Sequence, residues 1–254
     1  MERIADYEFV RPLGSGNHGH YYLARRPARL PVADELVAVK VLAGGSTPDT
    51  FRRAARELAA FAAVQSPYLV SLYDAGRQHG VFYYAGEYLP GGSLADAAAG
   101  TDVLRAVGHA ASAAAALHAA GIAHRDIKPG NVLLHDSGAK LSDLGLSHVF
   151  TSGLTLTGMG ELSAVEYADP DVLHGERPGP EADVWSLGVL LHRVVTGRGV
   201  YGELPQGNGL LALRKVLVSK PEIAESPVAG LVAECLAPAT ERITAAALAA
   251  RLLQ

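Results

Sequence analysis

The first third of the chain alternates short apolar runs with turns, as strands do. Runs at residues 7–13, 21–23, 36–42, 68–73 and 81–86 have the length and the β-branched or aromatic content of strands. A charged loop that contains prolines separates two of these runs at residues 25–35. The pattern predicts a small antiparallel sheet.

One amphipathic helix interrupts this series of strands. Thr47 and Pro48 form a good N-cap and first-turn pair, and the helix is expected to extend from about Asp49 to Ala63. Its apolar face is marked at helical spacing by Phe51, Ala54, Leu58 and Phe61. The helix should therefore pack beside the sheet.

From residue 95 onward the pattern is mainly helical. Gly121 ends an Ala-rich helix, and two short strands at residues 132–134 and 139–141 then flank a turn. Residues 183–191 open an almost fully apolar helix, which indicates a buried central helix. Residues 210–253 alternate helices with prolines, and Cys235 is expected to be buried in one of these helices. One face of the Ala-rich helix is formed by Leu104, Val107, Ala111, Ala114 and Leu117.

The polar residues that indicate chemistry lie between these helical regions. Residues 124–131 read His-Arg-Asp-Ile-Lys-Pro-Gly-Asn, and Asp143-Leu144-Gly145 follows. At these spacings Asp126, Lys128 and Asn131 can converge with Asp143 on a metal-bound phosphate. Each of them alone has an ordinary alternative as a loop charge or a turn former, so the combination carries the interpretation.

A glycine-rich segment, residues 14–19, lies between the first two predicted strands. Strands on both sides favour a hairpin over the strand-to-helix turn of a dinucleotide-binding fold. Glycines there let backbone N–H groups approach phosphate oxygens without obstruction by side chains. The alternative is a plain glycine-rich turn.

Lys40 places one cation inside an apolar strand that reads Val-Ala-Val-Lys. Such a lysine either protects an edge strand or is a buried cation with a designated partner, and its spacing from the glycine loop favours the second. Glu57, beside the apolar face of the following helix, is the expected partner. The alternative for Glu57 is a surface ion pair with Arg53 one helical turn earlier.

In chain order these features are the glycine loop, V-A-V-K, a helix glutamate, H-R-D, D-L-G and, at residues 183–188, D-x-W-S-x-G. This order resembles the eukaryotic-like, bacterial Hanks-type serine/threonine protein kinases over essentially the whole chain. The resemblance implies an α+β, bilobal fold. A small antiparallel β-sheet N-lobe with one main helix would comprise residues 1–86, a hinge residues 87–92 and a mainly helical C-lobe residues 93–254.

The resemblance also implies a role in phosphoryl transfer for each polar side chain. Asp126 would orient the acceptor hydroxyl and accept its proton, and Lys128 would balance charge on the transferred phosphoryl group. Asn131 and Asp143 would supply oxygen ligands to Mg²⁺, with Mn²⁺ as an alternative. Asp183 would cap its own helix, brace the backbone of the catalytic loop, or do both.

ATP is the implied nucleotide, bound between the two lobes. Lys40, held by Glu57, would bind the inner phosphates. The backbone of Glu87 and Leu89 would hydrogen-bond adenine, an assignment that rests on the resemblance because backbone recognition leaves almost no sequence signature. The residues assigned to nucleotide binding are Gly14, Gly16, Gly19, Tyr21, Ala38, Lys40, Glu87, Leu89, Ser93 and Leu133.

The implied substrates are proteins with Ser or Thr hydroxyls, because Lys128 follows the catalytic acid by two residues. Arg125 is predicted to bind a phosphate on the segment from residue 143 to 171, with Thr155 and Thr157 as the favoured sites by resemblance to bacterial receptor-type kinases. Self-association would let one copy phosphorylate another. The alternative is a hydroxyl-rich loop without modification.

Two departures from the family pattern concern the nucleotide pocket. Tyr21 stands where an aliphatic residue normally covers adenine, and Gly86 stands where most kinases carry a bulky side chain before the hinge acid. A large residue on one wall and none on another predicts a reshaped pocket. The chain should therefore be unusually sensitive to bulky inhibitors of the adenine site.

Two further departures lie in the segment that closes the activation region. The family's A-P-E reads Asp169-Pro170-Asp171 here, and the resemblance pairs Asp171 with Arg242. Ala164 stands where these kinases place a threonine that hydrogen-bonds the catalytic acid and lysine, with Ser163 beside it. This departure keeps a second hypothesis open, a kinase-like nucleotide-binding scaffold with little phosphotransfer. A small-molecule phosphotransferase is disfavoured by the catalytic and closing segments.

Composition narrows the class of protein further. The 254 residues are enough for one sizeable domain or two lobes, and a formal net charge of −4 argues against a nucleic-acid surface. The single cysteine excludes an internal disulfide framework. No signal peptide or bilayer-spanning run is present, so we expect a cytoplasmic protein or the cytosolic domain of a longer one.

Overall fold

The computed structural model of the protein describes residues 2–16, 19–42, 47–144, 162–205 and 208–254. These residues divide into two compact units. The N-terminal unit contains residues 2–63 and 70–88, and the C-terminal unit contains residues 64–69, 89–144 and 162–254, within the described ranges.

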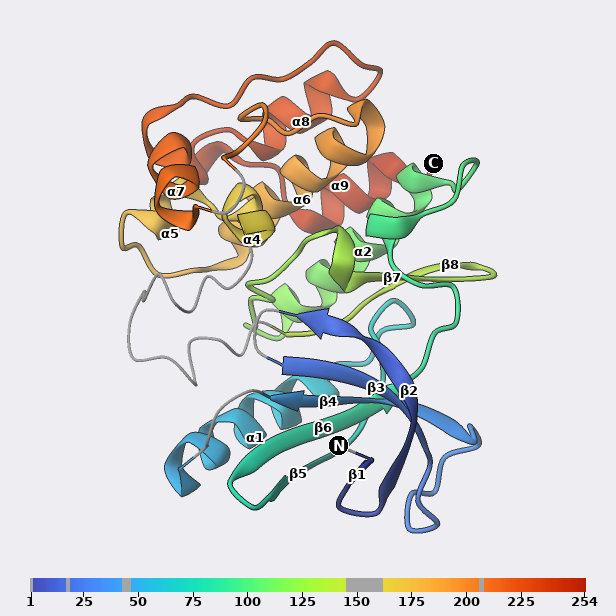
Figure 1. The fold of residues 1–254 in the computed structure, drawn as a ribbon. Helices are drawn as coiled ribbons and strands as arrows, with labels where there is room; N and C mark the ends of the chain where they lie inside the picture. Colours follow the sequence, from blue (N-terminus) through green and yellow to red (C-terminus); the bar gives the residue numbers. More distant parts are fainter. Residues whose placement is uncertain (1, 17–18, 43–46, 145–161, 206–207) are drawn as a thin grey trace. The chain divides into compact units, whose positions relative to one another are not determined.

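The N-terminal unit is built on a six-stranded sheet in the order β1-β2-β3-β4-β6-β5 (Figure 1). All neighbouring strands are antiparallel, and β4 lies in the interior between β3 and β6. The antiparallel sheet is therefore confirmed. The strands are β1 (Arg3–Ile4), β2 (Tyr7–Gly16), β3 (Gly19–Arg25), β4 (Leu36–Leu42), β5 (Leu72–Gln78) and β6 (Val81–Glu87).

The two faces of this sheet bury different residues because side chains alternate along each strand. One face carries the apolar core of the unit, in which Val37, Val39 and Val41 pack with Tyr7 and Tyr83. On the other face lies α1 (Pro48–Ala62), which buries Ala54, Leu58 and Phe61. Helix α1 begins at the predicted cap, where the Thr47 hydroxyl accepts a hydrogen bond from the Thr50 N–H at 3.1 Å.

One predicted strand, residues 68–73, is wrong. The strand in this region is β5 (Leu72–Gln78), which pairs with β6 through a turn in which His79 and Gly80 both have positive φ. Tyr68 and Leu69 belong instead to the C-terminal unit, where the Tyr68 carbonyl accepts a hydrogen bond from another segment. The prediction from strand propensity was wrong here because residues 74–78, whose own propensity for strand is weak, form a strand by pairing with β6.

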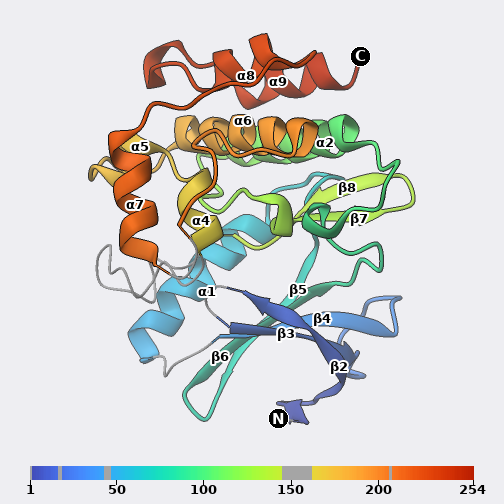
Figure 2. The ribbon, with the colours of Figure 1, turned by 45° about the horizontal axis from the view of Figure 1, so that its top comes forward.

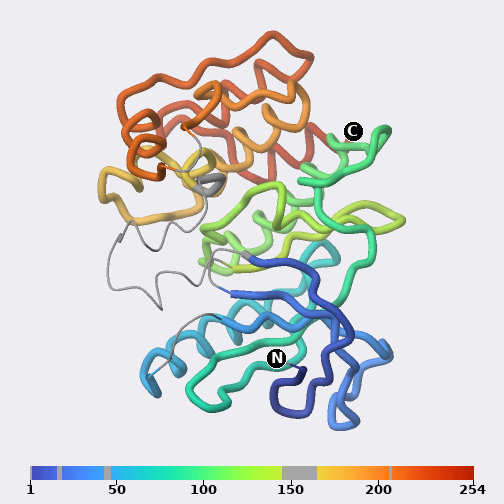
Figure 3. Tube along the Cα trace, viewed as in Figure 1, coloured from blue at the N-terminus to red at the C-terminus, as the bar shows by residue number. Residues whose placement is uncertain are grey.

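The C-terminal unit is mainly helical, with one small hairpin. Its elements are η1 (Leu94–Asp96), α2 (Val103–Ala119), η2 (Pro129–Asn131), β7 (Val132–His135), β8 (Gly138–Leu141), α4 (Leu162–Tyr167), α5 (Pro170–Leu173), α6 (Pro180–Thr196), α7 (Gly209–Val218), α8 (Ala229–Cys235), η3 (Ala239–Glu241) and α9 (Ala245–Leu252). The β7–β8 hairpin packs beside α2, as the chain trace in Figure 3 shows. The predicted strands at 132–134 and 139–141 are confirmed.

Helices α2 and α6 form the centre of this unit. Helix α9 packs on α2 and α8 packs on α6, so that α8 and α9 form a layer over the pair (Figure 2). Every residue of α6 from Asp183 to His192 is buried, which confirms the predicted central helix. At Gly188 a Cβ atom would lie 2.5 Å from the Cys235 Cβ, so glycine permits the close approach of α6 and α8.

The predicted burial of single residues in these helices is confirmed with one exception. On α2, Val107, Ala111, Ala114 and Leu117 are buried, whereas Leu104 in its first turn is exposed. Cys235 is buried on α8, and burial raises the pKa of its thiol to about 12, which keeps the thiol protonated and inert. No helix in the described part of the chain combines the length and the hydropathy that a membrane crossing requires.

Candidate active site

Residues 124–131, the predicted catalytic loop, bring three of the predicted side chains together around one carboxylate. Lys128 Nζ lies 3.1 Å from Asp126 Oδ2. The Asn131 amide donates to the backbone carbonyl of Asp126 at 2.7 Å and to Asp126 Oδ2 at 2.9 Å. Asp126 therefore has a fixed orientation, with a cation and an amide donor on the same oxygen.

Asp183 holds the backbone of this loop from the first turns of α6. Its side chain is 1% exposed, and its two carboxylate oxygens accept hydrogen bonds from the N–H groups of His124 at 2.7 Å and Arg125 at 2.8 Å. A third contact, 2.8 Å long, joins it to His118 Nε2 on α2. Because α6 has Gly179 as its N-cap, Asp183 is not a helix cap, and the brace implied by the family resemblance is its role here.

His124 connects the catalytic loop to the segment that follows β8. Its side chain is fully buried, with Nε2 3.0 Å from the Ser142 carbonyl. The Asp126 N–H approaches Nδ1 at 3.4 Å, so a neutral ring that donates from Nε2 satisfies both contacts. Burial lowers the pKa of His124, which favours this neutral form.

Asp143 lies two residues after the end of β8, in a left-handed backbone conformation with φ of 64°. The hairpin register pairs Val132 with Leu141, and the Ser142 N–H donates to the Asn131 carbonyl at 2.8 Å. Asn131 and Asp143 thus both lie at the open end of the β7–β8 hairpin. The hairpin holds these two residues in neighbouring segments, as the sequence predicted.

The donor set of this loop fits a magnesium ion. The buried Asn131 uses its Nδ2 on Asp126, and its Oδ1 accepts no hydrogen bond among the residues the structure describes. Amide and carboxylate oxygens are the hard ligands that Mg²⁺ prefers, and Mg²⁺ is usually held by few protein groups and by water or phosphate oxygens. The described residues contain no cluster of three or more His, Cys, Asp or Glu side chains suited to a metal.

Lys40 lies on β4 in the N-terminal unit, on the sheet face opposite the valine core. It pairs in register with Tyr21 of β3 and Tyr84 of β6, and its buried ammonium lies 4.8 Å and 5.9 Å from the centres of their rings. Cation–π attraction stabilises a desolvated ammonium in this position. Since β4 is an interior strand, protection of a sheet edge is excluded as the role of Lys40.

Glu57, the predicted partner of Lys40, is half-buried on α1 between the buried Ala54 and Leu58 positions. Its pairing with Lys40 remains a prediction, as does the alternative pair with Arg53.

The glycine-rich segment forms a hairpin, which confirms the choice made from the flanking strands. Gly16 pairs with Gly19, so β2 and β3 are joined through residues 17–18, which lie outside the described residues. At Gly19, φ is 155° and a Cβ atom would lie 2.1 Å from the Val41 carbonyl oxygen. The close approach of β3 to β4 therefore requires glycine at this position.

Comparison with known proteins places this geometry in a family. Residues 7–251 match the family model described as the protein kinase domain. The chain belongs to the protein kinase domain family. Members of this family use ATP and a divalent metal ion to phosphorylate proteins.

Several bacterial kinases are similar in sequence. The serine/threonine-protein kinase PknJ of Mycobacterium tuberculosis is 37% identical over 211 residues, which cover 78% of this chain and 35% of PknJ. PrkC of Bacillus subtilis, also a serine/threonine-protein kinase, is 29% identical over 201 residues, which cover 76% of this chain and 30% of PrkC. The kinase domain thus spans about a third of the length of these relatives.

A solved structure confirms the fold. The Mycobacterium tuberculosis PknI kinase domain superimposes with a TM-score of 0.71 at 22% sequence identity, covering 99% of this chain and 96% of that one. The α+β kinase fold expected from the sequence is therefore correct.

In this kinase domain, the contacts of Ser71 with the end of β6 explain the unusual Gly86. The Ser71 carbonyl accepts a hydrogen bond from the Glu87 N–H at 2.9 Å, and the Glu87 carboxylate accepts one from the Ser71 N–H at 3.2 Å. A Cβ atom at Gly86 would lie 2.7 Å from the same Ser71 carbonyl oxygen. Glycine here therefore permits close packing of the backbone of β6 against residue 71.

Two other residues assigned to the nucleotide lie next to each other in the C-terminal unit. Ser93 and Leu133 form an antiparallel bridge, and the Leu134 N–H donates to the Gly92 carbonyl at 2.8 Å. The Ser93 hydroxyl donates to Asp96 at 3.2 Å, so a contact with ribose would have to replace or share that bond.

The closing segment differs from the prediction in one respect. Arg242 lies 3.7 Å from Asp171, as expected, but its main partner is Asp169, which binds both terminal nitrogens of the guanidinium. Asp169 and Arg242 are 4% and 3% exposed, whereas Asp171 is 57% exposed. Arg242 also lies 5.0 Å from the centre of the Trp185 ring. Asp169 was not predicted as this partner, although an aspartate before Pro170 is a recognisable N-cap signal.

The predicted phosphorylation sites, Thr155 and Thr157, lie outside the described residues, as do Thr151 and Ser152. Arg125, their predicted partner, has an exposed side chain and a backbone φ of 70°. The backbone of Ala164 lies in α4.

Proposed function

We propose that this protein kinase domain is an active serine/threonine kinase that transfers the γ-phosphoryl group of ATP to protein hydroxyls. The observation that carries the proposal is the shared carboxylate oxygen of Asp126, which contacts both the Lys128 ammonium and the Asn131 amide. Related bacterial kinases named as serine/threonine-specific support the substrate class. We propose the same substrate class, proteins with Ser or Thr hydroxyls, for the whole protein.

The side chains of the catalytic loop would position the acceptor and neutralise charge during the transfer. Asp126 orients the acceptor hydroxyl and takes its proton, while the acceptor oxygen forms a bond to the γ-phosphorus and the bond from that phosphorus to the β-phosphate oxygen breaks. Lys128, beside Asp126, neutralises charge on the transferred group. Asn131 and Asp143 would hold Mg²⁺, or Mn²⁺ in its place, and the ion supplies charge neutralisation at the phosphates.

The N-terminal unit would supply most of the nucleotide contacts. Lys40 binds the inner phosphates, with Glu57 as its partner, and the Gly14, Gly16 and Gly19 backbone covers them. Adenine contacts come from the carbonyl of Glu87 and the N–H of Leu89, because the Glu87 N–H is already bonded to Ser71. Tyr21, Ala38, Ser93 and Leu133 complete the assigned set.

Regulation by phosphorylation is part of the same proposal. A phosphate on Thr155 or Thr157 would bind Arg125, whose backbone is fixed by Asp183 at 2.8 Å. One copy of the chain would phosphorylate another. Because the domain uses ATP, it would lie on the cytoplasmic side of the cell. Mass spectrometry of the wild-type protein expressed alone should find phosphate at these threonines, and Asp143→Asn should lack it.

A transfer assay tests the main proposal. The wild-type protein with ATP and Mg²⁺ should phosphorylate a mixed Ser, Thr and Tyr peptide library on Ser and Thr, and Asp126→Asn should lower kcat by about 10²- to 10⁴-fold. Asp136→Asn, in the exposed turn between β7 and β8, is the matched control and should retain activity. Binding of ATP without any transfer would support the scaffold alternative instead, and transfer to an aminoglycoside but to no peptide would indicate a small-molecule phosphotransferase.

A further inference from the structure

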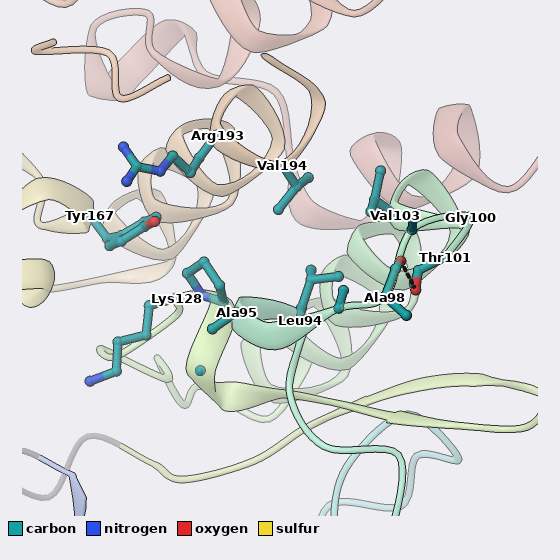
Figure 4. A pocket seen from close by; sticks show the side chains of 14 residues that line it. Leu94, Ala95, Ala98, Gly100, Thr101, Val103, Lys128, Tyr167, Arg193 and Val194 are labelled. Carbon is teal, nitrogen blue, oxygen red and sulfur yellow. Dashed lines mark hydrogen bonds between the residues drawn. The ribbon is translucent and has the colours of Figure 1, made fainter. Parts of the chain in front are cut away.

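The C-terminal unit contains an open pocket of about 600 Å³ that adjoins the catalytic loop (Figure 4). Its lining comes from η1 and the segment that leads to α2, from Lys128 to Gly130, and from Tyr167 with the last turn of α6. Lys128 connects the pocket to the site of chemistry, because its ammonium lies 3.1 Å from Asp126. A chain segment bound here would therefore lie next to the proposed catalytic acid.

The charged side chains that line the pocket are both cationic, Lys128 and Arg193. No Asp or Glu is among the lining residues that the structure describes. The two acids of the neighbouring segment have other partners: Asp96 accepts a hydrogen bond from the Ser93 hydroxyl at 3.2 Å, and Asp102 caps α2 by accepting from the Arg105 N–H at 3.0 Å. Because Lys128 is already paired with Asp126, the pocket can attract an anionic ligand through the partly exposed Arg193.

Arg193 is the cation that could bind such a ligand directly. Its side chain is 43% exposed, and its Nη1 lies 3.3 Å from the buried Glu166 carboxylate. Among the described residues Glu166 is its one ion-pair partner, so Nε and Nη2 remain for a second acceptor. These two nitrogens present the parallel N–H groups that bind a carboxylate in a bidentate manner.

Apart from Thr101, the rest of the pocket wall is apolar and made mostly of small side chains. It contains the buried Leu94 and the Tyr167 ring, and the remaining apolar lining is Ala95, Ala97, Ala98, Ala99, Val103 and Val194. Such a wall suits the side chains of a polypeptide better than a free inorganic anion. A sphere of this volume is about 10 Å across, which is the length of about three residues of extended chain.

We propose that this pocket binds the acceptor protein beside its phosphorylated hydroxyl and selects segments that carry Asp or Glu, next to an apolar residue, within about three positions of that hydroxyl. The carboxylate would bind Arg193, and the apolar side chain would pack on the alanine wall. This proposal rests on the kinase activity proposed above. It adds the chemical class of the substrate sequence.

The test compares peptides that share one Thr acceptor and one Leu and differ in a single residue, Glu, Ala or Lys, within three positions of the Thr. The wild-type protein should use the Glu peptide with a kcat/KM about tenfold higher than the Lys peptide, mainly through KM, since one partly exposed carboxylate–guanidinium contact is involved. Equal use of the Glu and Lys peptides would overturn the proposal.

Two variants link this preference to the pocket. Arg193→Gln combined with Glu166→Gln removes the cation without leaving a buried carboxylate unpaired, and the Glu/Lys ratio should fall to about two or less. Ala98→Glu, on the exposed part of the wall, adds an acid without touching Glu166 and should favour the Lys peptide. Arg198→Gln removes an exposed arginine just after α6 that does not line the pocket, and it should leave the ratio unchanged. A preference that survives both pocket variants would refute the assignment.

A binding measurement separates this proposal from the kinase activity. Fluorescence anisotropy of labelled Glu and Lys peptides, measured with ADP so that no transfer occurs, should show tighter binding of the Glu peptide and loss of that difference in the double variant. Binding with this pattern but no transfer to any peptide would leave the pocket assignment standing and refute the proposed function. Transfer without any charge preference in either assay would support the proposed function and refute the pocket assignment.

Discussion

The buried ion pair between Asp169 and Arg242 should contribute far more to stability than the pair between Asp171 and Arg242. Asp169→Asn removes the charge but keeps a side chain that caps α5 well, so the loss isolates the ion pair. Removing one partner of a buried pair costs about 3–5 kcal/mol, whereas an exposed pair at 3.7 Å contributes about 0–1 kcal/mol.

Thermal unfolding distinguishes the two aspartates. At roughly 2–4 °C per kcal/mol for a protein of this size, Asp169→Asn should lower Tm by about 6–20 °C and Asp171→Asn by about 4 °C at most. A double-mutant cycle with Arg242→Met should give a large coupling energy for Asp169 and a small one for Asp171. If Asp171→Asn destabilises the protein as much as Asp169→Asn, the reasoning from burial and distance fails.

Three further outcomes follow from the described contacts. In a urea titration, Gly86→Ala should lower the free energy of unfolding by about 1–3 kcal/mol, because the added Cβ would overlap the Ser71 carbonyl oxygen. The control Gly230→Ala, which has open space around it on α8, should be neutral or stabilising. Asp183→Asn should lower kcat with little change in the Km for ATP, measured by steady-state kinetics, because an amide cannot accept from both loop N–H groups; an unchanged kcat would contradict its role as a brace. His192 accepts a hydrogen bond from the Ala224 N–H through Nε2, and burial lowers the pKa of its ring. Its contribution to the free energy of unfolding should therefore be complete above pH 6.5 and should decrease as the pH falls below that value. In urea titrations at several pH values, His192→Gln should reduce this pH dependence.

The elements that the sequence predicted well are those with a strong local signal. Strand β4 has the predicted bounds because its apolar run lies between a charged loop that ends at Glu35 and the glycine pair Gly44-Gly45 in the sequence. Helix α1 begins at its cap because Thr47 and Pro48 act locally. Strand β5 was misplaced because its residues gain their structure from pairing with β6. Lys40 was correctly predicted as an interior cation, since the apolar strand around it leaves few other roles.

The catalytic residue types were accessible from sequence because the chemistry demands them, but the contacts that hold them were not. Asp169, two positions before Asp171, is the main partner of Arg242. Only the path of the backbone determines which of the two aspartates reaches the guanidinium. The double hydrogen bond from Asp183 was expected only from the family resemblance, because it depends on how α6 meets the loop. Neither contact leaves a periodicity or spacing that a single sequence displays.

The backbone of the active site shows why those hidden contacts matter. Arg125 and Asp143 have positive φ values of 70° and 64°, and among the described residues only two other non-glycine positions share this conformation. Each costs about 1–3 kcal/mol, so both persist only where neighbouring contacts determine them. Asp183 supplies such a contact at Arg125, and the Ser142 bond to Asn131 supplies one just before Asp143. Glycine would relieve the strain at these two positions, but it would remove the arginine and the carboxylate that the proposed function requires. The hydrogen bonds around the loop compensate for the strain instead.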